Sequence, residues 1–165
     1  MSGKIHSYLA ADHDRLDALL ERAGSDPERI DAAAYAEFRS GLLKHIGMEE
    51  KVLLPAAQKL RGGEALPLAA RLRLDHGALA ALLVPSPIAS IVAAIRAILK
   101  AHNPIEEAPG GIYDQCEALA GAEAERILRE LQTFREVKVL PHVDNEFVVE
   151  AARRSLARAG YDLKI

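Results

Sequence analysis

Two short motifs each place a histidine four residues before a glutamate. They read HIGMEE, with His45 and Glu49, and HNPIEE, with His102 and Glu106. Side chains at positions i and i+4 of an α-helix lie one above the other, so each pair can reach a shared centre. Imidazole nitrogen and carboxylate oxygen together suit iron, manganese or zinc. The spacing therefore indicates metal binding, although one such motif alone is a weak indication.

Two further histidines, His13 and His76, each follow an aspartate and lie on a line of leucines. Apolar residues recur at steps of three and four through all four histidine-containing segments, which is typical of helices with one buried face. Each helix would therefore point one histidine inward. The four stripes are Ile5, Leu9, His13, Leu16, Leu20; Phe38, Leu42, His45, Glu49, Val52, Ala56; Leu68, Leu72, His76, Leu79, Leu83; and Ile91, Ile95, Ile98, His102, Glu106.

The two glutamates on these stripes raise a charge problem. Burying a carboxylate without a partner costs on the order of several kcal/mol, and no lysine or arginine occupies the stripes. Metal ions can supply the missing positive charge, and six side chains are the natural number for a two-metal centre with bridging carboxylates. We therefore predict a metal site formed by His13, His45, Glu49, His76, His102 and Glu106. Histidines half-exposed at helix ends are the alternative.

Helix-breaking residues divide the chain into the helices that must position this site. Gly24, the pair Gly62-Gly63, and the segments PSP at 85–87 and APGG at 108–111 separate four long helices. No strand alternation or long repeat is present. The expected helices run from Ser2 as cap to about Ala23, from Asp31 as cap to Leu60, from about Leu66 to Val84, and from Ser86 as cap through HNPIEE, with 112–120 as a short continuation.

Two more helical stretches, 122–140 and 143–160, follow Gly121 and are divided by Pro141. We predict an all-α fold, most simply a four-helix bundle over residues 1–120 with a C-terminal helical extension over 121–165. The extension either packs on the bundle or forms the contact of a homodimer.

Composition limits the class of protein. Half of the 165 residues are apolar, and the net charge of −3 comes without a basic block, so we expect no nucleic-acid partner. The single cysteine excludes an intramolecular disulfide and favours a reducing compartment. No segment approaches the roughly 18 uninterrupted apolar residues of a membrane span. We therefore expect a cytoplasmic protein without a membrane partner.

The motifs together resemble the hemerythrin-like, or HHE cation-binding, family. ADHDRLDALL, HIGMEEKVLLP, LDHGALAALL and HNPIEEAPGGIYD follow the helical pattern of that family in order, over about residues 1–120. The resemblance implies an up-down-up-down bundle that holds two iron ions joined by an oxo or hydroxo group, with manganese or zinc as alternatives. It implies terminal ligands at His13, His45, His76 and His102, and bridging carboxylates at Glu49 and Glu106.

The resemblance also narrows the expected function. Ala80 stands where the oxygen-carrying hemerythrins have a further histidine after His76. The remaining ligand set is more similar to that of hemerythrin-like iron sensors and of di-iron proteins linked to iron–sulfur repair and nitrosative stress. We expect a non-haem di-iron binding protein for sensing, storage or stress protection, with oxygen, nitric oxide or iron as its small partner. The alternatives are a di-iron oxidase, peroxidase, nitric oxide reductase or repair protein, and a metal-free helical interaction module.

Six other polar residues have less specific interpretations. We expect His6 to be an exposed histidine at a helix start and His142 to lie on the surface. Cys116 is interpreted as a small core residue, and Tyr113 either hydrogen-bonds near the site or packs in the core. The glutamates that follow the presumed ligands, Glu50 and Glu107, are interpreted as solvated groups or as supports for the ligands.

Overall fold

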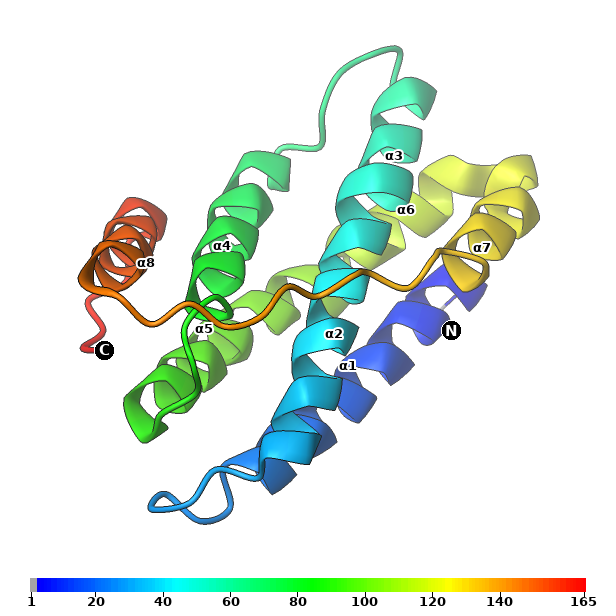
Figure 1. The fold of residues 1–165 in the computed structure, drawn as a ribbon. Coiled ribbons are helices and arrows are strands. Elements are labelled where there is room, and N and C mark those ends of the chain that lie inside the picture. Colours follow the sequence, from blue (N-terminus) through cyan, green and yellow to red (C-terminus); the bar gives the residue numbers. More distant parts are fainter. Residues whose placement is uncertain (1–2) are drawn as a thin grey trace.

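The chain is all-helical in a computed structural model that describes residues 3–165, and no strand occurs in that range. The helices lie side by side as a bundle (Figure 1). The elements are α1 (Lys4–Ala23), α2 (Ala32–Met48), the π-helix η1 (Glu49–Leu53), α3 (Leu54–Leu60), α4 (Ala69–Leu82), α5 (Ala89–Glu107), α6 (Ile112–Ala120), the 3-10 turn η2 (Gly121–Glu123), α7 (Ala124–Gln132) and α8 (Glu146–Ala159).

Several helix ends form where the sequence predicts them. Asp31 caps α2, because its side chain accepts a hydrogen bond from the backbone N–H of Ala34. The same helical segment continues through η1 and α3 to Leu60 and ends before Gly62 and Gly63, whose φ angles of 74° and 103° are left-handed. The predicted cap Ser2 lies outside the described residues.

Two predicted helix boundaries are wrong. Ser86 does not cap α5, which begins at Ala89. The backbone N–H and the hydroxyl of Ser86 instead donate to the Asp144 carboxylate at 2.7 and 2.6 Å. The helix predicted over 122–140 ends at Gln132. The residues after it are rich in β-branched side chains and precede Pro141, which disfavours helix at the preceding position.

Residues 133–145 instead form a strap that crosses the bundle between α7 and α8 (Figure 1). The buried Arg39 of α2 donates to the carbonyl oxygens of Leu83 and Leu140, at 2.7 and 2.8 Å. The backbone N–H of Val143 donates to the carbonyl of Val84 at 3.1 Å. These contacts satisfy backbone groups that a helix would otherwise have paired internally.

The buried apolar side chains form two clusters rather than one. The first contains Leu16, Leu42, Leu79 and Ile98, and α8 adds Leu156 to it. The second lies along the same helices in the other direction, with Leu9, Met48, Leu72 and Ile112, and α7 adds Leu131. In α1, α2 and α4 the histidine predicted as a ligand lies between members of the two clusters, and in α5 His102 lies between Leu99 of the first cluster and Ile105, which packs against the second.

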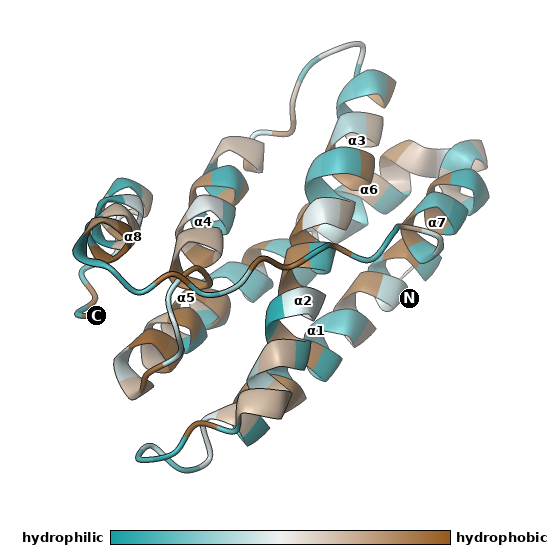
Figure 2. Cartoon of the chain, viewed as in Figure 1, coloured by the Kyte–Doolittle hydropathy of each residue, from teal (hydrophilic) through white to brown (hydrophobic). Residues whose placement is uncertain are grey.

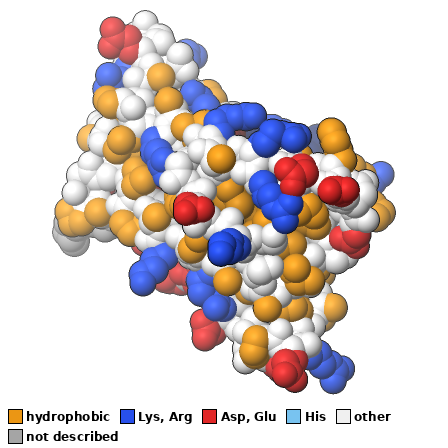
Figure 3. Space-filling model, turned by 90° about the vertical axis from the view of Figure 1, so that its left-hand side faces the viewer, with side chains coloured by type: hydrophobic (Ala, Val, Ile, Leu, Met, Phe, Trp, Pro, Cys, Tyr) orange, Lys and Arg blue, Asp and Glu red, His pale blue; other side chains and the backbone are white. Residues whose placement is uncertain are grey.

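Apolar residues line the facing sides of neighbouring helices, and hydrophilic residues colour much of their outer sides (Figure 2). On the face that Figure 3 shows, basic, acidic and apolar side chains are interspersed. Among the described residues, no helix is both long enough and apolar enough to cross a membrane.

A tight turn between α5 and α6 returns the chain to the bundle. Gly110 has a φ of 78°, and the N–H of Gly111 donates to the Ala108 carbonyl at 2.6 Å. A Cβ atom on Gly111 would lie 2.6 Å from the Glu106 carbonyl oxygen and 2.8 Å from those of Ile105 and Ala108. Only glycine fits this close approach of backbone to backbone. The turn places α6 over 112–120, as predicted.

Substitution of two glycines by alanine is expected to have opposite effects on stability. Gly111→Ala forces the turn apart and should destabilise the protein by about 1–3 kcal/mol. Gly77→Ala, in the exposed middle of α4 with no atom within 4 Å of the added Cβ, should stabilise it by about 0.5–1 kcal/mol. Urea unfolding followed by circular dichroism measures both changes. Equal effects of the two substitutions would contradict this account of the turn.

Candidate metal centre

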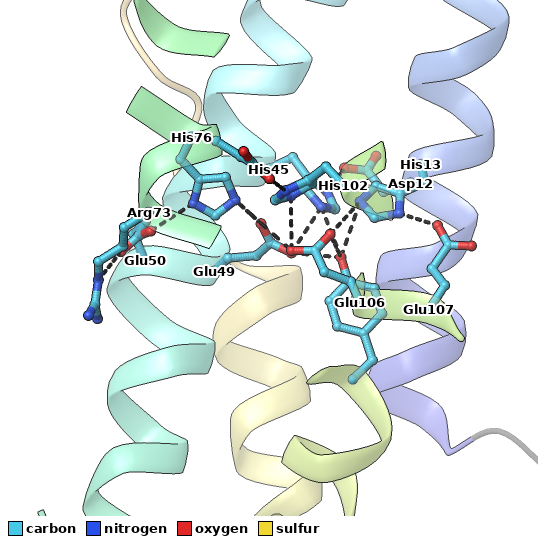
Figure 4. Close-up of polar contacts among 12 residues, drawn as sticks. Asp12, His13, His45, Glu49, Glu50, Arg73, His76, His102, Glu106 and Glu107 are labelled. Carbon is cyan, nitrogen blue, oxygen red and sulfur yellow. Dashed lines mark hydrogen bonds and ion pairs between the residues drawn. The ribbon is translucent and has the colours of Figure 1, made fainter. Parts of the chain in front are cut away.

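The structure brings the six predicted ligands together in one buried volume between the long helices (Figure 4). His13 comes from α1, His45 from α2, His76 from α4 and His102 from α5. Each of the six side chains belongs to a residue that is at most 4% exposed. The polar groups therefore form a layer between the two apolar clusters, where water cannot solvate their charge.

Glu49 and Glu106 are the two inner glutamates, and each of their carboxylate oxygens faces the Nε2 atom of a different histidine. Every glutamate thus spans two histidines from different helices, and Figure 4 shows the two carboxylates lying between the imidazoles. The atom pairs are His45 Nε2 and Glu49 Oε1 at 3.3 Å, His76 Nε2 and Glu49 Oε2 at 3.1 Å, His102 Nε2 and Glu106 Oε1 at 3.2 Å, and His13 Nε2 and Glu106 Oε2 at 3.4 Å.

These atoms form two sets that could each hold a metal ion. Within each set, the ligand atoms all lie within 4.8 Å of one another. Both sets include both glutamates, so two ions bound there would be neighbours connected by the carboxylates. The histidine-13 set contains His13, His45, Glu49 and Glu106, and the histidine-76 set contains Glu49, His76, His102 and Glu106.

A second group of carboxylates surrounds the centre and contacts the Nδ1 atoms of the same histidines. An ionised carboxylate only accepts hydrogen bonds, so Nδ1 carries the proton and Nε2 presents a lone pair to the centre. Each outer carboxylate belongs to a different helix from its histidine. The pairs are Asp12 with His45 at 2.8 Å, Glu50 with His76 at 2.7 Å, Asp75 with His102 at 3.1 Å, and Glu107 with His13.

These four contacts close a ring around the bundle, which we call the Nδ1 ring. α1 supplies a carboxylate to α2, η1 to α4, α4 to α5, and α5 back to α1. Arginines contact three of the outer carboxylates: Arg15 with Asp12 at 2.8 Å, Arg73 with Glu50 at 3.1 Å, and Arg71 with Asp75 at 2.9 Å. The arginine charge therefore compensates the ring, not the two inner glutamates.

Several inner atoms have no adequate partner in the part of the chain described. Glu49 Oε2, Glu106 Oε1 and His76 Nε2 are buried and make no hydrogen bond of acceptable geometry there. Lone pairs on nitrogen and oxygen that face each other at 3.1 Å repel unless a proton or a cation lies between them. The donor types, their burial and these unpaired atoms fit a metal ion.

Protons can take the place of metal in the metal-free chain. Burial lowers the pKa of His45, but the charge of Glu49 and the contact with Asp12 outweigh it and raise the pKa to about 10. Burial is likewise outweighed at His102 by Asp75 and Glu106, which raise its pKa to about 10. At His76, Glu49 and Glu50 raise the pKa to about 9 despite burial.

The two glutamates respond differently to the same surroundings. Burial and the neighbouring Glu49 charge raise the pKa of Glu106. Burial alone would raise the pKa of Glu49 too, but the charges of His45 and His76 hold it well below its usual value. The metal-free centre therefore holds several protons near neutral pH, which bound metal would displace.

The helix widens at Glu49, the second residue of the first histidine–glutamate pair. In η1 the N–H of Leu54 donates to the Glu49 carbonyl, five residues back. Pro55 has no N–H to offer Lys51, so an α-helical bond is already missing at this turn. The π-helix directs Glu49 into the centre and lets Glu50 reach His76 from outside. Pro104, between the ligands of α5, does not end that helix.

Sequence reasoning did not single out two residues of the Nδ1 ring, Asp12 and Asp75. The available signal was the repeated dipeptide Asp-His, which occurs once in each of two helices. The pairing was hidden because each aspartate contacts the histidine of the next helix, not its sequence neighbour. Glu50 and Glu107 support the ligands, as one of their two interpretations held.

The remaining polar residues are placed as follows. The expectation of an exposed His6 is wrong, because it is 8% exposed and contacts Asp114 at 2.6 Å. Cys116 is buried, as predicted. His142 is partly exposed and lies 3.3 Å from the Val84 carbonyl. Tyr113 is buried and hydrogen-bonds within the centre.

The metal-free protein is expected to melt at a lower temperature as pH rises from about 6.5 to about 9.5. An unfolded histidine has a pKa of about 6.5, whereas His45 and His102 have values of about 10 and His76 about 9 when folded. Their bound protons stabilise the fold fully below pH ~6.5, and this contribution is lost as pH rises through the folded values. Each proton bound only by the folded chain changes stability by about 1.4 kcal/mol per pH unit.

Calorimetry of protein dialysed against a chelator measures this dependence. His45→Gln should make it shallower, and His142→Gln, a change in a partly exposed histidine outside the centre, should leave it unaltered. A melting temperature that stays constant or rises over this pH range would contradict the assignment of protons to the centre.

Comparison with known proteins gives one similarity. Residues 2–77 match a family described as protein of unknown function (DUF3572), which is less than half of the chain. The matched segment ends just after His76 and leaves out α5, with His102 and Glu106. No curated protein and no solved structure matches the chain. The matched family has no assigned activity, so a proposal about function has to rest on the geometry of the centre.

Proposed function

We propose that the protein is a hemerythrin-like, non-haem di-iron protein in which α1, α2, α4 and α5 form an up-down-up-down four-helix bundle around the metals. One observation carries the proposal: two sets of buried ligand atoms share both Glu49 and Glu106. A pair of carboxylates common to two adjacent sets is the arrangement that a bridged two-metal centre requires. The sequence motifs that resemble the family supply the same six residues.

The chain's own residues have distinct tasks in this proposal. His13 and His45 hold one iron, His76 and His102 hold the other, and the inner glutamates hold both. The outer carboxylates fix each imidazole with Nδ1 protonated, which orients Nε2 and makes it a better donor. The two apolar clusters exclude water from both sides of the layer. When bound, the iron pair supplies reversible change of oxidation state and affinity for oxygen or nitric oxide; manganese or zinc suit the same donors.

A binding role suits the centre better than turnover of an organic substrate. The six ligands are almost fully buried, and their facing atoms lie 3.1–3.4 Å apart. Metal ions and diatomic molecules are ligands of a size that such a centre suits. We therefore propose sensing or storage of iron, or protection against oxygen or nitric oxide. A di-iron oxidase, peroxidase or nitric oxide reductase would use the same residues, and counting turnovers after reduced protein is mixed with each gas or peroxide separates the two functions.

Metal analysis tests the proposal directly. Protein purified without oxygen and given ferrous iron is expected to retain two iron ions per chain. His45→Ala should lower that number, because it removes one ligand from the histidine-13 set. His142→Ala, outside the centre, is the matched control and should retain the wild-type content. Well under one metal per wild-type chain, or full content in His45→Ala, would refute the proposal.

The Nδ1 ring gives a second prediction. Asp12 and Asp14 both neighbour His13 in the sequence, but only Asp12 contacts His45. Asp12→Asn removes the carboxylate that orients His45 and should weaken iron binding by about 10–100-fold. Asp14→Asn, an exposed position on the other side of His13, should change the affinity little. Competition with a chromophoric chelator measures both. Equal losses in the two variants would indicate a general charge effect instead of orientation.

A further inference from the structure

The hydroxyl of Tyr113, the tyrosine of the segment HNPIEEAPGGIYD, lies within the centre. Tyr113 is fully buried in the first turn of α6, two residues after the turn glycine Gly111. Its oxygen contacts four side-chain atoms from three helices and η1. They are Glu49 Oε1 at 2.6 Å, His13 Nε2 at 3.1 Å, His45 Nε2 at 3.2 Å and Glu106 Oε2 at 3.3 Å.

These four residues are the histidine-13 set, contacted through the same atoms that face one another in the centre. All four atoms are acceptors when Nδ1 of each histidine carries the proton. A phenol has a single proton, and Glu49 Oε1 at 2.6 Å is its nearest acceptor. With both histidines neutral, as metal ligands must be, the other three acceptors face a phenol oxygen that has only lone pairs left for them. A cation among these five atoms would relieve all of these contacts together.

The distances also have the size expected of ligands on one metal. With metal–ligand bonds of about 2.1 Å, two ligands at right angles lie about 3.0 Å apart. The four Tyr113 distances run from 2.6 to 3.3 Å, on both sides of that value. An ion that bonds the four set atoms can therefore bond the Tyr113 oxygen as a fifth. In the described chain, Tyr113 makes no such contact with His76 or His102.

We propose that Tyr113 is a phenolate ligand of the iron held by His13 and His45, an inference that rests on the di-iron function proposed above. When the oxygen–iron bond forms, the O–H bond breaks and its proton passes to solvent, while the oxygen donates an electron pair to the metal. A bound di- or trivalent metal ion displaces the proton from a coordinating group, as it does from a thiol. The neighbouring iron keeps four protein ligand atoms.

The two irons would therefore be unequal. An anionic oxygen ligand favours the more highly charged ferric state, so the iron beside Tyr113 should hold that state more firmly than its neighbour. The iron of the histidine-76 set would have fewer protein ligands and so more coordination positions for oxygen or nitric oxide. Tyr113 thus assigns the diatomic ligand to one side of the centre.

Absorption spectra of iron-loaded, oxidised protein test the inference, together with the iron content of the same samples. Phenolate bound to ferric iron gives a charge-transfer band in the visible region, and excitation within it enhances phenolate vibrations in the Raman spectrum. The wild type should show both signals, and Tyr113→Phe should lose them while retaining two iron ions. Tyr35→Phe is the matched control, because Tyr35 is a buried tyrosine of the first apolar cluster whose hydroxyl has no hydrogen bond within residues 3–165.

The possible results are distinct. Iron content of two with the visible band in wild type and Tyr35→Phe, and without it in Tyr113→Phe, supports the inference. Full iron content with no phenolate signal in the wild type overturns the assignment of Tyr113 as a ligand and leaves the di-iron function intact. Failure of the wild type to retain iron overturns both. Zinc binding gives a second readout. If Tyr113 is a ligand, zinc should produce a phenolate ultraviolet difference signal in the wild type that Tyr113→Phe lacks. An equal melting temperature of the two proteins shows that the variant is folded.

Discussion

Two carboxylates buried in the interior of a helical bundle are the constraint on which the rest of the structure depends. Glu49 and Glu106 have almost no exposure, and the arginines near the centre contact the outer carboxylates instead. Within the described centre, positive charge beside them can come from protons on the four imidazoles or from bound metal, while Tyr113 adds a neutral hydrogen bond to Glu49. Either form of compensation requires four helices to meet at one level, because each supplies a single histidine.

The same constraint shapes the apolar core. Because the polar layer crosses the bundle, the core consists of two clusters; α1, α2 and α4 contribute buried residues to both, and α5 packs Ile105 against the second. A shift of one helix along its axis would move its histidine into an apolar cluster and a leucine into the polar layer. The helices therefore reach their correct register only when the centre assembles, because misaligned packing would bury unpaired charge.

The sequence was sufficient for the features that depend on local periodicity. Steps of three and four identified the six histidines and glutamates that face inward, and Asp31 and the paired glycines marked helix ends. It did not reveal features that depend on contacts between distant segments. Residues 133–145 are not helical, and Arg39, far away in the chain, donates to the Leu140 carbonyl within them. Asp75 contacts a histidine 27 residues away, and the position of Tyr113 depends on a turn geometry that spacing does not encode.

The Nδ1 ring has a direction, and this gives it a consequence for topology. Going round the bundle, each carboxylate meets the imidazole of the following helix, never that of the preceding one. A bundle with the same helices in mirror-image order would place every carboxylate beside the wrong neighbour and separate the four acids from the imidazoles that they contact. The dipeptides Asp-His and Glu-Glu, each present in two helices, therefore specify the handedness of the assembly as well as its chemistry.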